Sequence, residues 1–395
     1  MAFSSFTECA ILLHIIERHP CSETGEPMKR IFIQDHKPIP FLFRQTTEDF
    51  IVDEIPLTEN SDRGNYFIAK IQKQNLSTME MLTILEEATH CDHIGYAGLK
   101  DKAATTTQYI SLPLKFSKAL KQLKHPQIQI VEGFRSPKKL SLGDLKGNRF
   151  FIRLKEVSPK SAQHLKELLD EIMRYGMPNY FGYQRFGRDS ANYEKAQEIA
   201  HGEEELRDKK MQRLLTNAYQ SYLFNDWLVK RIALSKEIAI ASEQTLSERY
   251  GLSELQVQQL KNQPGIFRVI PGDIMLDHQS RKWVNVTDLQ EIRKPYKERK
   301  LSPTGLMSGR KAWRAKAMAA TIEKDFDDML VLAAGERRPA WIYPMEIRSK
   351  YKPEEKFFEL SFTLPKGSYA TVLLENLANR DLSPAERGAS KPSAF

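Results

Sequence analysis

Short stretches of alternating apolar and polar residues in the first half of the chain predict a β-sheet. Residues 49–55 and 66–71 are rich in β-branched and aromatic side chains, as is typical of strands, and a third strand is predicted at 107–112. Residues 148–157 alternate apolar side chains with aromatic and basic ones, which predicts a strand with one apolar and one basic face. The pattern therefore predicts a sheet with one face against a core and the other facing solvent or a ligand.

Two helices are predicted beside these strands. The first begins at Ser77, where Glu80 completes a capping box. Its apolar residues hold helical spacing: Met79, Leu82, Leu85 and Ala88. The second runs from Pro159 to about Tyr175 and ends at Gly176, because glycine readily adopts the conformation that ends a helix.

The pattern changes after Gly176. Long helical patterns occupy 190–262 and 308–335, and strand patterns return at 341–347 and 357–364. The simplest architecture is an α+β fold in which a mixed domain is interrupted by a mostly helical insertion. The two sequence-distant parts of the mixed domain would then complete one sheet.

The predicted domain boundaries follow from this change. The predicted parts are a first domain of residues 28–175 plus 343–380, an insertion of residues 176–342 and a mobile tail of residues 381–395. Residues 1–27 are predicted to be an extension that is disordered or that precedes a native start at Met28.

The charge of the chain points to a nucleic-acid partner. The net charge is +8, and residues 115–155 alone carry eleven lysines and arginines against two acidic residues. Such a stretch suits a phosphate backbone, and the nearby Phe134, Phe150 and Phe151 suit stacking on unpaired bases. A merely solubilising surface explains the charge alone equally well.

The remaining composition indicates where the protein works. Three cysteines, Cys9, Cys21 and Cys91, cannot supply a disulfide framework, and the longest apolar run is too short to span a bilayer. We therefore expect a soluble cytoplasmic protein with no membrane partner. The sequence leaves the oligomeric state open, with a monomer favoured.

The segment Gly-Tyr-Ala-Gly-Leu-Lys-Asp-Lys at 95–102 carries the strongest chemical signal. Its glycines predict a sharp turn, and Asp101 stands between Lys100 and Lys102. Because neighbouring positive charge favours the ionised form, such a carboxylate is suited to act as a nucleophile or base. A solvated turn with exposed ions is the alternative interpretation.

Metal and cofactor chemistry find little support in the sequence. His90, Cys91, Asp92 and His93 are ligand-rich, but adjacent residues on a helix point to different faces, so no metal site is predicted there. The sequence contains no P-loop, no GxSxG elbow and no GxGxxG fingerprint. We therefore expect no metal and no small-molecule cofactor.

Five segments, in this order and spacing, closely resemble the TruD family of tRNA pseudouridine synthases: GYAGLKDKAATTTQ, LKGNRFFIRLK, MPNYFGYQRFG, AYQSYLFN and FTLPKGSYAT. The resemblance runs from about Met28 to Leu377. It implies a pseudouridine-synthase catalytic domain with an antiparallel mixed sheet, interrupted by the helical insertion of the family. It also implies cofactor-free conversion of uridine to pseudouridine in tRNA, with uridine 13 of the D arm as the usual target.

The same resemblance assigns roles to individual residues. Asp101 matches the catalytic aspartate of the family. The residues that match substrate-binding positions are Phe50, Glu54, Lys100, Asn148, Phe150 and Tyr369. Asn148 and Phe150 match an N-x-F motif whose ring stacks on the target base, and Tyr369 aligns with an aromatic residue that is phenylalanine in some relatives.

The implied isomerisation is redox-neutral and needs only a carboxylate near the sugar. Asp101 could attack C1′ or abstract the C2′ proton to form a glycal, and the sequence leaves both routes open with the glycal route favoured. The alternative function is a non-catalytic RNA-binding or RNA-folding protein, which would gain nothing from a carboxylate among phosphates. An RNA methyltransferase would need a nucleoside-cofactor pocket, for which no glycine-rich loop is visible.

Overall fold

The computed structural model describes residues 30–57, 61, 63–186 and 193–382, so the predicted extension 1–27 and nearly all of the predicted tail lie outside the described residues. The described chain forms two compact units. The sheet unit consists of Pro38–Arg174 and Tyr343–Ala370, and the insertion unit consists of Tyr175–Ile342 with residues 30–37 and 371–382. Residues 371–380, which the sequence assigns to the first domain, thus group with the insertion unit.

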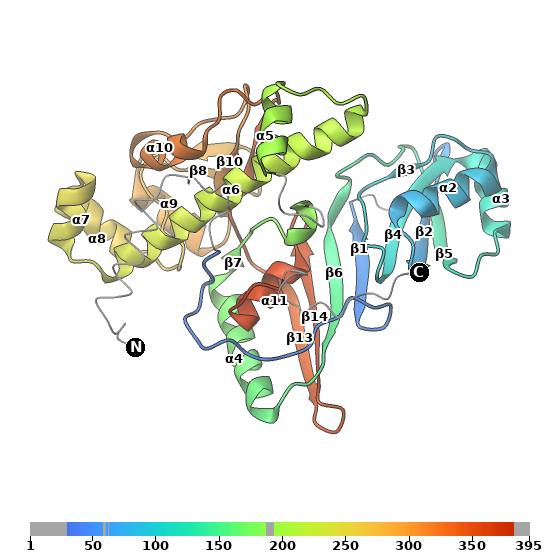
Figure 1. Ribbon diagram of the computed structural model, residues 1–395, viewed down its shortest axis with the longest axis horizontal. Helices are drawn as coiled ribbons and strands as arrows, with labels where there is room; N and C mark the ends of the chain where they lie inside the picture. The colour runs from blue at the N-terminus through green and yellow to red at the C-terminus, as the bar shows by residue number, and fades with distance from the viewer. Residues whose placement is uncertain (1–29, 58–60, 62, 187–192, 383–395) are drawn as a thin grey trace. The chain divides into compact units, whose positions relative to one another are not determined.

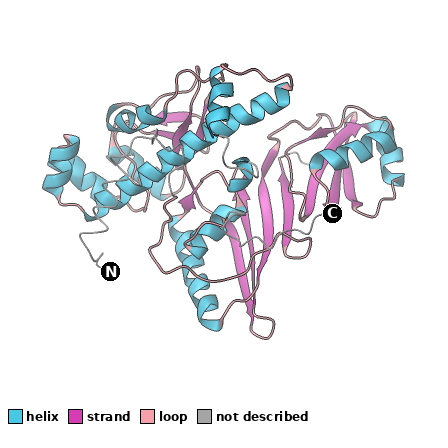
Figure 2. Cartoon of the chain, viewed as in Figure 1, coloured by secondary structure: helices cyan, strands magenta, loops and turns pink. Residues whose placement is uncertain are grey.

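The sheet unit is built on an eight-stranded mixed sheet (Figures 1 and 2). The strand order is β13-β14-β6-β1-β4-β2-β5, with β3 beside β4. The strands are β1 (Phe50–Pro56), β2 (Tyr66–Gln74), β3 (Gly95–Tyr96), β4 (Thr105–Pro113), β5 (Ile128–Ser136), β6 (Leu145–Leu154), β13 (Met345–Lys352) and β14 (Phe357–Pro365). Strands β1 and β4 pair in parallel and the other pairs are antiparallel, which confirms the predicted α+β class.

Helices α2 (Thr78–Thr89) and α3 (Ser117–Gln122) pack on one face of this sheet. The predicted capping box is confirmed, because Ser77 Oγ accepts from the Glu80 backbone N–H and the Glu80 carboxylate accepts from the Ser77 N–H. The predicted apolar face of α2 is wrong at Met79, which is 50% exposed, and at Ala88. The residues that pack instead include Met81, Leu82 and Leu85, in one cluster with Ala69, Ile71 and Ile110 of the strands.

Helix α4 (Pro159–Tyr175) has the predicted bounds. The Ser158 hydroxyl accepts from the Ser161 N–H at 3.1 Å, which satisfies the first turn. Gly176, at the end, has φ +77°, a conformation that glycine adopts without strain. The predicted alternation of β6 is also confirmed, because Phe150, Ile152 and Leu154 are buried and the residues between them are partly exposed.

The insertion unit combines helices with two small sheets. The helical elements are η2 (Tyr183–Phe186), α5 (Tyr193–His201), α6 (Lys209–Ile240), α7 (Glu243–Tyr250), α8 (Glu254–Lys261), α9 (Leu289–Lys297), α10 (Ala317–Glu323), η3 (Lys324–Phe326) and α11 (Ala370–Ala378). Strands β8 (Ile274–Asp277), β9 (Trp283–Asn285), β10 (Leu301–Met307) and β11 (Glu336–Pro339) form a four-stranded sheet, and β7 (Met177–Pro178) pairs with β12 (Trp341–Ile342).

The helical pattern predicted at 308–335 is largely wrong. Only α10 and the short helical turn η3 are helical there, and residues 308–316 form a loop. Long helices are confirmed for 193–261, where α6 alone has 32 residues. No helix among the described residues is long and apolar enough to cross a bilayer.

Candidate active site

Asp101 lies in the connection between β3 and β4. Although its side chain reaches solvent, the surrounding protein removes enough water to raise the pKa of the carboxyl, while the positive charges of Lys73 and Lys100 lower it. A raised pKa makes the ionised carboxylate a stronger proton acceptor. The local environment therefore suits an aspartate that works as a base.

The expectation that both adjacent lysines hold Asp101 ionised is only partly right. Lys102 forms an ion pair with Glu80 at 2.6 Å, in which both side chains are exposed. Among the positive charges near Asp101, that of Lys73 on β2 lowers the pKa of the carboxyl most. Lys73 Nζ also donates a 3.0 Å hydrogen bond to the Asp101 carbonyl oxygen. Lys73 therefore takes the place that the sequence suggested for Lys102.

Lys73 is the residue of this site that sequence reasoning missed. Its side chain is fully buried and also donates to the Leu76 carbonyl at 2.5 Å. Burial lowers the pKa of Lys73 to about 8, while the negative charge of Asp101 opposes that shift. The sequence signal that indicates a buried lysine is its position, because Lys73 continues the apolar face of β2 formed by Ala69 and Ile71.

Lys100 and Glu54 form a buried ion pair next to Asp101. Lys100 Nζ lies 2.5 Å from a Glu54 carboxylate oxygen, and the two side chains are 5% and 1% exposed. The other Glu54 oxygen accepts from the Tyr109 N–H at 3.1 Å. Both residues were predicted to bind substrate, and here they bind each other and fix the residue before Asp101 to strand β1. Direct contact of either with substrate stays a prediction.

A second anchor holds the same loop to α2. The Lys100 N–H donates to Thr78 Oγ1 at 2.8 Å, and the Thr78 hydroxyl donates to Gln108 Oε1 at 3.0 Å. Thr78 is the first residue of α2, and Gln108 lies on β4. The backbone leading to Asp101 is therefore tied to a helix and to two strands, which holds the carboxylate in one place.

Asn148 and Phe150 lie on β6, opposite Glu54 and Val52 of β1. Residues opposite one another in a sheet share a face, so Asn148 and Phe150 lie on the same face as Glu54. The Phe150 ring stacks between Phe50 at 6.3 Å and Phe362 at 5.4 Å and is 6% exposed. These neighbours cover both ring faces, so Phe150 packs within the sheet here, and its stacking on a base stays a prediction.

Unpaired polar atoms surround this region of the sheet. Asn148 Oδ1, Gln108 Nε2 and Thr106 Oγ1 are buried and have no hydrogen-bond partner among the described residues. Buried polar atoms are nearly always paired in folded proteins. An acceptor and two hydrogen-bonding groups left open beside Glu54 therefore mark a place where a polar ligand would bind.

Tyr369 follows β14 in the turn before α11 and is half-buried. The neighbouring Ser368 Oγ is buried and has no hydrogen-bond partner among the described residues. The metal-ligand candidates stay apart, since His90, Asp92 and His93 are exposed while Cys91 is buried. Within the described ranges, no group of three His, Cys, Asp or Glu side chains is arranged to hold a metal ion.

Comparison with known proteins shows the family to which this chain belongs. The family model described as tRNA pseudouridine synthase D (TruD) matches residues 28–206 and 255–377. Proteins named tRNA pseudouridine synthase D from Nitratiruptor sp. and Wolinella succinogenes are each 44% identical over 357 and 361 residues, covering 90% of this chain and 99% of theirs. The chain belongs to the TruD family.

A solved structure shares the fold. It is titled as a putative tRNA pseudouridine synthase D from Methanosarcina mazei, and it superposes with a TM-score of 0.60 over 92% of this chain and 99% of that chain at 22% identity. The TruD fold thus extends across both units of the protein.

Two of the five TruD segments contact one another inside the insertion unit. The Phe181 N–H donates to Asn225 Oδ1 at 2.8 Å, and Asn225 Nδ2 donates back to the Phe181 carbonyl at 3.1 Å. The Arg338 guanidinium lies 3.8 Å from the centre of the Phe181 ring. These segments, MPNYFGYQRFG and AYQSYLFN, therefore have a structural role within the insertion unit of this TruD protein.

Phe150→Ala is expected to lower the free energy of unfolding of this TruD protein by about 3–5 kcal/mol, because it empties a stacked, buried position. Urea denaturation measures this loss, and an unchanged midpoint would contradict the packing described above. Phe150→Leu keeps most of the apolar volume without the ring. If Phe150 contacts the target base, the leucine variant turns over more slowly per folded molecule than the wild type.

Proposed function

We propose that this TruD-family protein converts uridine to pseudouridine in tRNA, with uridine 13 of the D arm as the target and Asp101 as the catalytic residue. The family membership supports pseudouridine formation in tRNA, an isomerase activity. The observation that carries the choice of catalyst is Asp101 itself, an accessible carboxylate on an anchored loop beside unpaired polar groups. We place the catalytic domain in residues 28–175 and 343–380, with 176–342 as the insertion.

In the proposed reaction the carboxylate of Asp101 takes the C2′ proton of the target nucleotide. The electron pair forms the C1′–C2′ double bond of a glycal, and the C1′–N1 bond breaks to release a uracil anion. After the uracil turns, C5 bonds to C1′ and Asp101 returns the proton to C2′. C5 then loses its hydrogen as a proton, and N1 takes up a proton. Direct attack of Asp101 on C1′ would use the same carboxylate, and the raised pKa of Asp101 favours the proton-transfer route.

Asn148 and Gln108 are suited to hold the uracil while it turns. Gln108 Nε2 is an open donor and Asn148 Oδ1 an open acceptor. The imide edge of uracil has an N–H between two carbonyl oxygens, so it looks the same before and after a half-turn about the N3–C6 axis. Groups that bind this edge therefore make the same hydrogen bonds before and after the turn, so they favour neither orientation.

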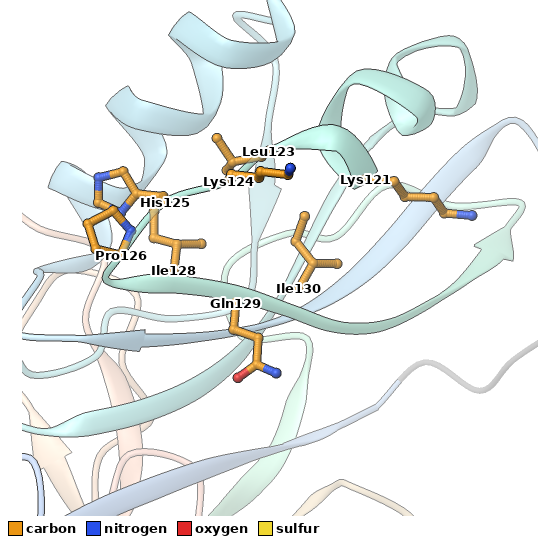
Figure 3. A pocket seen from close by; sticks show the side chains of 8 residues that line it. All are labelled: Lys121, Leu123, Lys124, His125, Pro126, Ile128, Gln129 and Ile130. Atoms are coloured by element: carbon orange, nitrogen blue, oxygen red, sulfur yellow. The ribbon is translucent and has the colours of Figure 1, made fainter.

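A basic surface of the sheet unit is suited to bind the tRNA backbone. The lysines at 115, 118, 121 and 124 are all exposed, along α3 and its flanking turns. Lys121, Lys124 and His125 line an open pocket of about 550 Å³ between the end of α3 and β5 (Figure 3). Neutralising phosphates releases counterions, so this surface supplies affinity that does not depend on base sequence.

The affinity for tRNA is expected to fall steeply with salt. Replacing Lys118 and Lys124 by glutamine should reduce the slope of log Kd against log salt by about 1–2, because each phosphate contact contributes about 0.7–0.9. Filter binding or fluorescence anisotropy between 50 and about 200 mM salt measures the slope. Lys166→Gln on α4 is the matched control, since it removes one exposed charge outside the basic stretch. Equal slopes in all variants would exclude this surface from the contact.

The function is tested by incubating the purified protein with an unmodified tRNA transcript and mapping pseudouridine by carbodiimide-dependent primer-extension stops. A single stop at position 13 of the D arm supports the proposal, and a stop elsewhere in the tRNA corrects the target. Salt-sensitive tRNA binding without any stop favours the non-catalytic RNA-binding protein that the sequence left as the alternative.

A further inference from the structure

Trp313 stands apart from the other tryptophans of the insertion unit. Its side chain is 56% exposed, whereas Trp283 is half-buried and Trp227 and Trp341 are 2% and 1% exposed. Tryptophan is highly buried on average, because it has a large apolar surface to remove from water. Trp313 lies in the loop of residues 308–316 between β10 and α10, which we call the tryptophan loop.

The start of the tryptophan loop is fixed by backbone contacts. A Cβ on Gly309 would lie 2.4 Å from the Gly335 nitrogen. Because both residues are glycines, the two backbone segments can lie in direct contact. The next two residues extend this contact, because the Arg310 N–H donates to the Ala333 carbonyl at 3.0 Å and the Lys311 N–H donates to the Ala334 carbonyl at 2.7 Å.

The second half of the loop is fixed by two arginines. Arg314 pairs with Asp327 at 2.6 Å and also donates to the Ala312 and Gly309 carbonyls, each at 3.1 Å. The buried Arg337 donates to the Trp313 carbonyl at 2.8 Å while it pairs with Glu323. The backbone on both sides of Trp313 is therefore held in place, and the ring is displayed outward by a pre-organised loop.

The exposed charges around Trp313 are mostly positive. Arg310, Lys311 and Lys316 are exposed, and no ion pair involves them among the described residues. Four nearby acidic side chains are engaged: Glu323 with Arg337, Asp325 with Lys230, Asp327 with Arg314 and Asp328 with His201. One further carboxylate, Glu336, is exposed on β11 opposite Met307, the residue before the loop. The loop therefore presents an aromatic ring among three exposed cations that form no ion pair within the described part of the chain.

We propose that the tryptophan loop is an RNA-binding site, in which Trp313 stacks on an unpaired base and Arg310, Lys311 and Lys316 bind the adjoining phosphates. Flat side chains interleaved with cations are the arrangement that binds single-stranded nucleic acid. The proposal rests on the proposed function only for the identity of the RNA, which is tRNA. Exposed Met329 lies 2.9 Å from Arg314 and would suit a protein partner, but the surrounding positive charge favours RNA.

The test compares tRNA affinities of Trp313→Ala and Trp313→Phe with that of the wild type. Trp313→Ala should weaken binding by about 5- to 100-fold, as expected for loss of one stacked base, and Trp313→Phe should restore most of it. Leu255→Ala is the matched control, because Leu255 is a 63% exposed apolar residue on α8 of the same unit. Unchanged thermal unfolding of each variant shows that the loop change is local.

Equal affinities for the wild type and Trp313→Ala would overturn the proposal. So would weakened self-association of Trp313→Ala in sedimentation with unchanged RNA binding, since the loop would then serve a second copy of the chain. Pseudouridine formation is measured on the same samples. A wild type that binds tRNA without modifying it overturns the proposed function, while the comparison at Trp313 still decides this inference.

Discussion

Replacing Asp101 by asparagine is expected to lower the rate of pseudouridine formation by about 10²- to 10⁴-fold, and to leave tRNA binding nearly unchanged. The substitution keeps the shape of the side chain and removes only its ability to accept a proton or to attack carbon. The loop should keep its position, because the bonds that hold it involve the Asp101 carbonyl and the Lys100 N–H and not the carboxylate. Single-turnover kinetics with saturating enzyme measures the chemical step apart from binding.

Asp92→Asn is the matched control for this experiment. Asp92 is an exposed carboxylate in the turn after α2, and its loss removes the same charge from the same unit. Its rate should match that of the wild type. Comparable rates for Asp101→Asn and the wild type would remove Asp101 from the mechanism, and a large loss of tRNA affinity in Asp101→Asn would show that the carboxylate also organises the binding surface.

The second large effect is expected at the buried ion pair beside Asp101. The Glu54 carboxylate is 1% exposed, and Lys100→Met removes its cation partner in the pair. Because an unpaired buried charge is costly, we expect the free energy of unfolding to fall by about 3–5 kcal/mol. The double variant Glu54→Gln, Lys100→Met removes both charges and should recover most of this loss. Urea denaturation of the wild type and the single and double variants gives the coupling between the two residues.

Lys102→Met supplies the contrast, because the pair of Lys102 with Glu80 has similar length but is exposed on both sides. Only a small change in unfolding midpoint is expected there, since water screens such pairs. If Lys100→Met and Lys102→Met are equally stable, burial does not decide the strength of the Lys100–Glu54 pair. Activity that survives in the double variant would show that neither charge has a direct role toward substrate.

Local chemistry made part of this fold predictable. The capping box at Ser77 and the helix from Pro159 to Gly176 depend on neighbours within a turn, and both are found as expected. The alternation of β6 is equally predictable, because Phe150, Ile152 and Leu154 on one face are buried and their neighbours are partly exposed. In each case the deciding residues lie close together in the sequence.

The arrangement around Asp101 was less predictable because it depends on strand pairing. Glu54 reaches Lys100 only because β1 lies beside β4 in parallel, and Lys73 reaches the Asp101 carbonyl from β2 on the other side of β4. The ring of Phe150 is covered by residues of β1 and of the distant β14. No pattern within one segment contains this information.

The helical pattern predicted at 308–335 is wrong in the tryptophan loop for another reason, because tertiary contacts outweigh the local helix preference there. The residues from 308 to 335 include many alanines, lysines and other good helix formers, so a helical pattern was predicted there. The contact between Gly309 and Gly335 and the hydrogen bonds of Arg314 and Arg337 hold residues 308–316 in another conformation. Tertiary contacts of this kind outweigh the intrinsic helix preference of the segment.

The pairing of β6 with β14 also sets an order for biosynthesis. Strand β6 ends at Leu154 and its partner begins at Phe357, so about 200 residues, including most of the insertion unit, leave the ribosome between them. At about 5–20 residues per second this interval lasts roughly 10–40 s. Until then β6 is an open edge strand with Phe150 lacking one of its stacking partners, and such an edge is a template for aggregation. The nascent chain must therefore keep β6, the edge of the six strands already made, shielded while the insertion folds.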